Sequence, residues 1–279
     1  MTRPESPAGP PASPLEARVT AALARRGRWR LPEYAFWALA LAALFLFPSQ
    51  YLILNEIAII GLFALSLDLL LGYSGIVSLG HAAFFGLGAY TAGLLAKHGV
   101  TEPVAGLFAA AATAAALGFA TSFLVLRGSD LTRIMVTIGV ALVLAETANK
   151  LDWLTGGADG LQGIMMGPVL GTFEFDLWGQ TAYGYSLAVL FVLVLLARRV
   201  VHSPFGLSLR SIRDNPLRAA AVGIPVGRRL VAVYTLAAAY AGVAGALLAQ
   251  TTQFVSLDVL EFHRSADVLL VLIIGGTGY

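Results

Sequence analysis

The sequence predicts an all-α, polytopic transmembrane helical bundle, and its composition, its apolar runs and its charge distribution each support this fold class. Hydrophobic residues make up 58% of the 279 residues and charged residues only 12%, whereas a soluble domain carries about 25% charge. So little charge does not cover the surface of a soluble enzyme domain. The chain has no cysteine, which excludes thiolate metal sites and cysteine nucleophiles.

The apolar runs define the expected helices. Five runs without Asp, Glu, Lys or Arg are long enough to cross a hydrocarbon core of about 30 Å: 34–55, 69–96, 103–126, 177–197 and 230–257. Runs such as 35–47 and 187–197 lack the polar–apolar alternation of barrel strands, so helices are expected. With the shorter runs added, we expect spans at 34–50, 52–71, 80–97, 104–126, 131–149, 181–198 and 230–251.

An eighth span begins near Ala266 and is incomplete, because only 14 residues remain to the last residue of the sequence. A helix of this length rises about 21 Å, which is too short to cross. We therefore expect about eight spans, and a chain that is a fragment of a longer protein.

The basic residues predict the orientation of the bundle. Thirteen of the 18 Lys and Arg residues lie in segments 3–30 and 198–229. Positively charged loops stay on the cytoplasmic side, so both segments are expected there, with six spans between them. The segment 152–182 has four acids and no basic residue, and is expected outside. Residues 1–33 are predicted to be a disordered, Arg-rich cytoplasmic tail, and 34–279 a transmembrane domain.

Small residues recur at intervals of four in two of the expected spans. One stripe runs from Gly106 to Ser122 and the other from Ala238 to Ala249. Stripes of this kind let helix backbones approach closely. They predict helix packing and say nothing of function.

Several chemical motifs are missing. The only two lysines, Lys97 and Lys150, are followed by His98 and Leu151, so no P-loop for nucleotide phosphates is present. We expect no catalytic residues, metal ligands or bound cofactor in this chain, and if ATP drives its function, partner chains would hydrolyse the ATP. A net charge of +2 gives no reason to expect nucleic-acid binding.

A glycine-rich segment, 71–90, interrupts a charge-free stretch of membrane character. Glycine lets a backbone leave helical geometry, and broken helices at membrane depth line cavities or lie buried in protein. The segment is therefore a candidate substrate path. The alternative is a short loop with packing glycines, in which His81 is a hydrogen-bonded structural residue. The candidate path residues are Tyr73, Ser74, Gly75, Ser78, Gly80, His81 and Tyr90.

A second segment, 202–229, is predicted to be a structured cytoplasmic projection. Ser203-Pro204 can start a helix, Asn215-Pro216 can end it and start another, and Gly223 can end the second. Because the sequence specifies two helices with defined ends, this segment is interpreted as a docking element. The alternative is a basic loop that only sets the membrane topology. The candidate docking residues are Arg210, Arg213, Asp214, Asn215, Ala219 and Gly223.

Four motifs in the same order resemble the permease subunits of branched-chain amino acid ABC transporters. They are Gly72–Tyr90, Leu154–Ile164, Ser203–Gly223 and Gly275–Gly278. The resemblance implies an importer in the bacterial inner membrane. Its partners would be a second homologous permease subunit, two cytosolic ATPase subunits that meet the docking residues, and a periplasmic solute-binding protein. The family also contains urea and amide permeases, so the substrate stays open.

Two departures and one alternative accompany this resemblance. ABC permeases commonly couple through Glu-Ala-Ala-x-x-x-Gly, but alignment on Gly223 puts Leu217 where the glutamate is expected. Ser129 follows Arg127-Gly128 where the family usually has an aromatic residue. The alternative function is an ion-coupled secondary transporter, which needs a buried titrating acid such as Asp68 or Glu146.

Overall fold

The computed structural model describes residues 31–176 and 178–277, which form helices and two isolated β-bridges but no strand. The chain divides into a short unit, residues 1–39, and a large unit, residues 40–279. Each unit is described by itself. Residues 1–30 of the predicted cytoplasmic tail lie outside the described residues.

The first described helix, α2, runs from Leu31 to Leu46 and starts inside the range expected for the tail. It ends before residue 50 because Pro48 disfavours helical geometry at the residue before it. Phe47 accordingly leaves the helix, with φ −126° and ψ 61°, and a short 3-10 turn, η1 (Pro48–Gln50), follows.

Every other expected span falls on a helix of the large unit. The longer helices are α3 (Tyr51–Ser74), α4 (Ala82–Lys97), α5 (Pro103–Val125), α6 (Asp130–Lys150), α8 (Gln180–Val201), α11 (Val226–Thr252) and α12 (Phe262–Gly275). The shorter elements are α7 (Asp152–Thr155), η2 (Gly157–Asp159), α9 (Pro204–Asp214), α10 (Pro216–Ala221) and η3 (Leu257–Leu260).

Within residues 31–176 and 178–277, five helices are long and apolar enough to cross a membrane: Pro48–Ser74, Pro103–Val125, Asp130–Lys150, Gln180–Val201 and Val226–Thr252. The all-helical, multi-span class is therefore confirmed, but the count of eight spans is not. The α4 helix has 16 residues and α12 has 14, which corresponds to rises of about 24 and 21 Å. Both are too short to cross alone.

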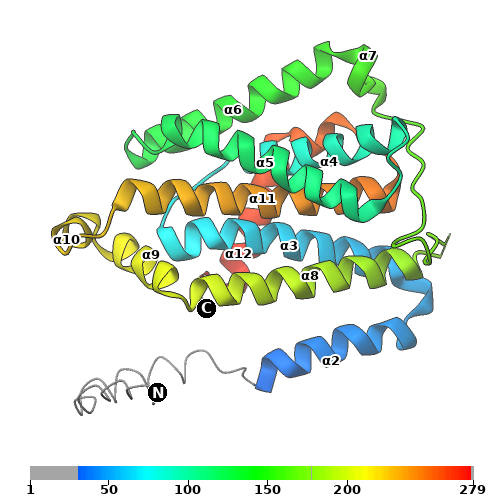
Figure 1. Cartoon of the computed structure of the whole chain (residues 1–279), viewed down its shortest axis with the longest axis horizontal. Helices are drawn as coiled ribbons and strands as arrows, with labels where there is room; N and C mark the ends of the chain where they lie inside the picture. The colour runs from blue at the N-terminus through cyan, green and yellow to red at the C-terminus, as the bar shows by residue number, and fades with distance from the viewer. Residues whose placement is uncertain (1–30, 177, 278–279) are drawn as a thin grey trace, which may run out of the picture. The chain divides into compact units, whose positions relative to one another are not determined.

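The core of the large unit is built around α11. This helix packs along α3, α4 and α5, which lie beside it in Figure 1. The two small-residue stripes pack against each other here, and the buried residues of α5 include Gly106, Ala110, Ala114 and Gly118. A Cβ atom added to Gly242 of α11 would lie 2.7 Å from the carbonyl oxygen of Ala110. The two backbones are therefore as close as glycine and alanine allow.

Two connections meet at the ends of α4 and α11. Leu161, after η2, and Val255, after α11, form an antiparallel bridge with N–H to oxygen distances of 2.7 and 3.3 Å. Both side chains pack against Gly93 of α4. The long connection before α8 is therefore tied to the segment that leads into η3 and α12.

Candidate functional site

The predicted helix break is present between α3 and α4. The α3 helix ends at Ser74, and Gly75 takes the left-handed conformation with φ +74°, which glycine adopts without steric cost. The chain then runs without α-helix until Ala82. Six of the seven candidate path residues, all except Tyr90, lie in this break or within two residues of it, at the end of α3.

Gly80 and His81 hold the break tightly in the protein interior. A Cβ atom added to Gly80 would lie 1.8 Å from the carbonyl oxygen of Thr137 in α6, so only glycine fits. His81 is fully buried, its Nε2 atom lies 3.0 Å from the Ser66 hydroxyl, and its ring stacks on Phe63 at 5.7 Å. His81 is thus hydrogen-bonded and packed.

Two candidate path residues end in buried hydroxyl groups without a hydrogen-bond partner among the described residues, Ser78 and Tyr90. Ser74 differs, because its hydroxyl donates to the Leu70 carbonyl at 2.5 Å. A buried hydroxyl without a partner costs about 1–3 kcal/mol. Ser78 and Tyr90 are therefore places where water or a solute would gain hydrogen bonds.

Two large hollows in the surface of the large unit lie elsewhere. One of about 930 Å³ runs between α5 and α11, and one of about 790 Å³ runs between α5 and α8. None of the seven candidate path residues lines either hollow. In this structure the break is packed rather than open.

The predicted cytoplasmic projection consists of α9 and α10, with the predicted ends. The Ser203 hydroxyl accepts the N–H of Phe205 at 3.2 Å, and the Asn215 side chain accepts that of Arg218 at 2.9 Å. These are N-caps of the kind serine and asparagine favour. Ala219 is buried, and Gly223, with φ +88°, follows α10.

Part of this projection presents apolar side chains to the outside. Leu217 is 83% exposed and Val222 is 75% exposed, on and next to α10. Asp214 and Asn215 are exposed beside them. Exposed apolar side chains rimmed by polar ones are typical of a surface that binds another protein.

The structure brings the two candidate groups of residues together. The Arg213 guanidinium donates to the Gly72 carbonyl near the end of α3. The Arg210 guanidinium lies 5.2 Å from the centre of the Tyr73 ring, in cation–π geometry. A Cβ atom added to Gly75 would lie 3.1 Å from Cγ of Arg213. Because the last carbonyls of a helix carry partial negative charge, an arginine at this end is favourable.

The two acids singled out for ion coupling are not fully buried. The Glu146 carboxylate is 58% exposed and pairs with Lys150 at 3.4 Å. Asp68 is of intermediate burial. No Asp or Glu is among the buried side chains of residues 31–176 and 178–277.

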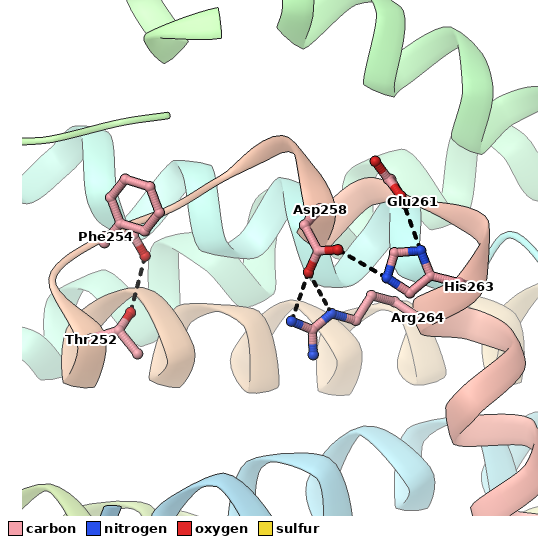
Figure 2. Close-up of polar contacts among 6 residues, drawn as sticks. All are labelled: Thr252, Phe254, Asp258, Glu261, His263 and Arg264. Carbon is pink, nitrogen blue, oxygen red and sulfur yellow. Dashed lines mark hydrogen bonds and ion pairs between the residues drawn. The ribbon is translucent and has the colours of Figure 1, made fainter. Parts of the chain in front are cut away.

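A charged group that the sequence analysis missed lies at η3 and the start of α12. We call it the polar quartet: Asp258, Glu261, His263 and Arg264, drawn in Figure 2. His263 contacts Asp258 through Nε2 and Glu261 through Nδ1, both at 2.9 Å, and Arg264 donates to Asp258 at 2.7 and 3.0 Å. The sequence does hold a signal for this group: four ionisable residues lie within seven positions of a chain that is otherwise poor in charge.

Comparison with known proteins identifies relatives across most of this fold. The family model described as "Branched-chain amino acid transport system / permease component" matches residues 51–279. Two curated relatives are named high-affinity branched-chain amino acid transport system permease protein LivM. The one from Escherichia coli (strain K12) is 30% identical over 240 residues, and the one from Salmonella typhimurium (strain LT2) is 29% identical over 240 residues.

Each alignment covers 77% of this chain and 55% of the relative. The chain thus spans about half the length of the curated relatives it matches. No solved structure gives a significant match.

Proposed function

Because this chain belongs to the family of branched-chain amino acid permease components, we propose that it is the membrane-spanning subunit of an ATP-driven importer. Its cargo would be branched-chain amino acids or related small polar solutes, and its place the bacterial inner membrane. The partners are a second, homologous permease, two cytosolic ATPase subunits that hydrolyse the ATP, and a periplasmic binding protein. The observation that carries this proposal is the contact between α9 and the end of α3.

The surface around α10 would receive the ATPase. Leu217 and Val222 are largely exposed there, and their burial against a partner would contribute favourable free energy. The segment from Arg198 to Arg229 carries seven arginines, which favours its placement in the cytoplasm, where the ATPase is. Leu217, in place of the usual glutamate, makes this contact apolar rather than acidic.

The contacts of Arg210 and Arg213 would carry movement from the ATPase into the membrane. Both arginines reach from α9 to the last residues of α3. A shift of α9 would therefore pull on the residues from which the helix break begins. In this assignment Arg213 transmits movement within the chain, and the outer surface of α10 makes the contact with the ATPase.

The secondary-transporter alternative has less support. It needs an acid that is buried and titrates during the transport cycle. The two candidates are an exposed, ion-paired Glu146 and an Asp68 of intermediate burial. A capped, two-helix projection with exposed apolar residues has no role in that mechanism.

The test is ATPase association and substrate-stimulated hydrolysis of the reconstituted complex. Leu217→Asp places a charge in the proposed contact, so the ATPase should dissociate more readily and stimulation and uptake should fall. Met165→Asp is the matched control, because Met165 is 75% exposed in the segment expected outside. It should leave ATPase association unchanged. Equal association of both variants would refute α10 as the docking surface, and ATP-independent uptake would refute the importer.

A further inference from the structure

The polar quartet lies well inside the depth that lipid occupies. Leu260 of η3 packs directly against Gly86 of α4, and the Ser265 hydroxyl accepts the N–H of Ala82 at 2.8 Å. The α4 helix ends at Lys97. Gly86 lies 11 residues before that end, or about 16 Å along the helix, and Ala82 lies 15 residues before it, or about 22 Å. Lys97 borders a polar hollow with Asp152 and Asp159, so that end meets water. A hydrocarbon core of about 30 Å therefore includes the quartet.

These charges are open to their surroundings at that depth. The exposed fractions of the four side chains run from 32% for Arg264 to 56% for Glu261. Asp267, one turn beyond His263 on α12, is also exposed. Charged side chains at membrane depth avoid lipid and face protein or water. In the assembled transporter, this face is therefore covered by another subunit or lines an aqueous path.

The chemistry of the quartet favours the aqueous path. Asp258 uses both carboxylate oxygens, one toward His263 and one toward Arg264, and both ring nitrogens of His263 face carboxylates. Burial of the charged Asp258, Glu261 and Arg264 side chains in a protein interface carries a large desolvation cost, and interface cores are depleted of charge. Water imposes no such cost.

The quartet keeps open binding capacity of both signs. The contacts among the described residues use Oε2 of Glu261 and the Nε and Nη2 atoms of Arg264. They leave Oε1 of Glu261 and Nη1 of Arg264 for a ligand. Tyr90 lies one turn beyond Gly86 on the same face of α4, and its buried hydroxyl has no partner among the described residues.

We propose that the polar quartet lines the solute path and binds the charged head group of an α-amino acid, Glu261 its ammonium group and Arg264 its carboxylate. This inference rests on the proposed importer function and narrows it. A zwitterion uses both charges, whereas urea and simple amides use neither. The polar quartet therefore favours amino acids over the uncharged substrates of related permeases.

Chemical modification in the cysteine-free chain tests the aqueous path without requiring transport. Phe262→Cys, beside Glu261 and 43% exposed, is assembled with its partners in membrane vesicles and treated with a cationic, membrane-impermeant methanethiosulfonate. Because reaction requires a hydrated thiolate, it should proceed at least about tenfold faster than at Val143→Cys, an exposed apolar position on α6. Leucine should slow the reaction and urea should not. Equal rates, or no protection by leucine, would overturn the proposal.

Uptake by charge-neutral variants tests the head-group contacts. Glu261→Gln and Arg264→Gln should each lower leucine uptake by about 10–100-fold, the usual effect of a lost charge-assisted hydrogen bond. Glu146→Gln removes an exposed ion pair of the same kind on α6 and should leave uptake unchanged. If the unmodified transporter imports leucine and all three variants match it, the quartet assignment is wrong. If the unmodified transporter shows no ATP-driven uptake, the proposed function fails, and the modification rates still decide whether the face is wet.

Discussion

Replacement of Gly80 by alanine should loosen the contact between the helix break and α6. The added Cβ would lie 1.8 Å from the Thr137 carbonyl oxygen, and real Cβ contacts essentially never fall below 3.0 Å. The two segments must therefore separate by about 1.2 Å, the difference between these distances. Because the obstacle is backbone rather than a flexible side chain, no rotamer change relieves it. Overpacking of this kind costs about 1–3 kcal/mol.

The assay is thermal unfolding of the purified complex, followed by loss of its monodisperse elution. A cost of 1 kcal/mol lowers Tm by about 2–4 °C in a chain of this size class, so Gly80→Ala should lower Tm by about 2–12 °C. Gly139→Ala is the matched control, because Gly139 lies in α6 itself and an added Cβ meets nothing within 4 Å. It should be neutral or slightly stabilising. Equal Tm values for the two variants would refute the close approach of Gly80 to α6.

Three further predictions concern the connections outside the core. An impermeant thiol reagent applied to intact cells should label Asp159→Cys and not Asp214→Cys, and the reverse pattern would overturn the orientation. Burial alone would raise the pKa of the Asp176 carboxyl, but backbone N–H donors at the start of α8, that of Thr181 first, lower this pKa below its usual 3.8. The carboxylate therefore stabilises the fold at neutral pH, and Asp176→Asn should be less stable than the unmodified protein at pH 7. This difference in stability should vanish as the pH falls below about 3.8, and a difference that stays constant with pH would contradict the prediction. Asn215→Ala removes the N-cap of α10 at a cost of about 0.5–2 kcal/mol, so hydrogen exchange across 217–222 should accelerate, and unchanged exchange would count against the cap.

Local patterns in the sequence predicted the helices and several of their ends. Apolar runs located the spans because a helix in lipid must satisfy its own backbone. Pro204 and Pro216, each preceded by a capping residue, located α9 and α10. The small-residue stripes predicted close helix packing, because only small side chains permit such an approach, but they did not identify which helices meet.

Contacts between segments that lie far apart in the sequence could not be predicted from these local patterns. Arg213 looked like a surface charge for a partner, yet it bonds to Gly72, 141 residues earlier in the chain. The sequence analysis interpreted Gly80 as a flexible position. The structure shows instead that the Thr137 backbone leaves no space for a larger residue there. The quartet was not predicted, because its residues follow the apolar run 230–257 and only the fold places η3 against α4.

The bond from Arg213 to Gly72 also bears on how the protein is made. Chains emerge from the ribosome at about 5–20 residues per second, so the partner of Gly72 is synthesised about 7–28 s after it, given the separation of 141 residues. During that interval α3, α4, α5 and α6 can enter the membrane while the end of α3 lacks the arginines that later cover it. The break between α3 and α4 therefore reaches its final form late in synthesis, only after α9 has emerged.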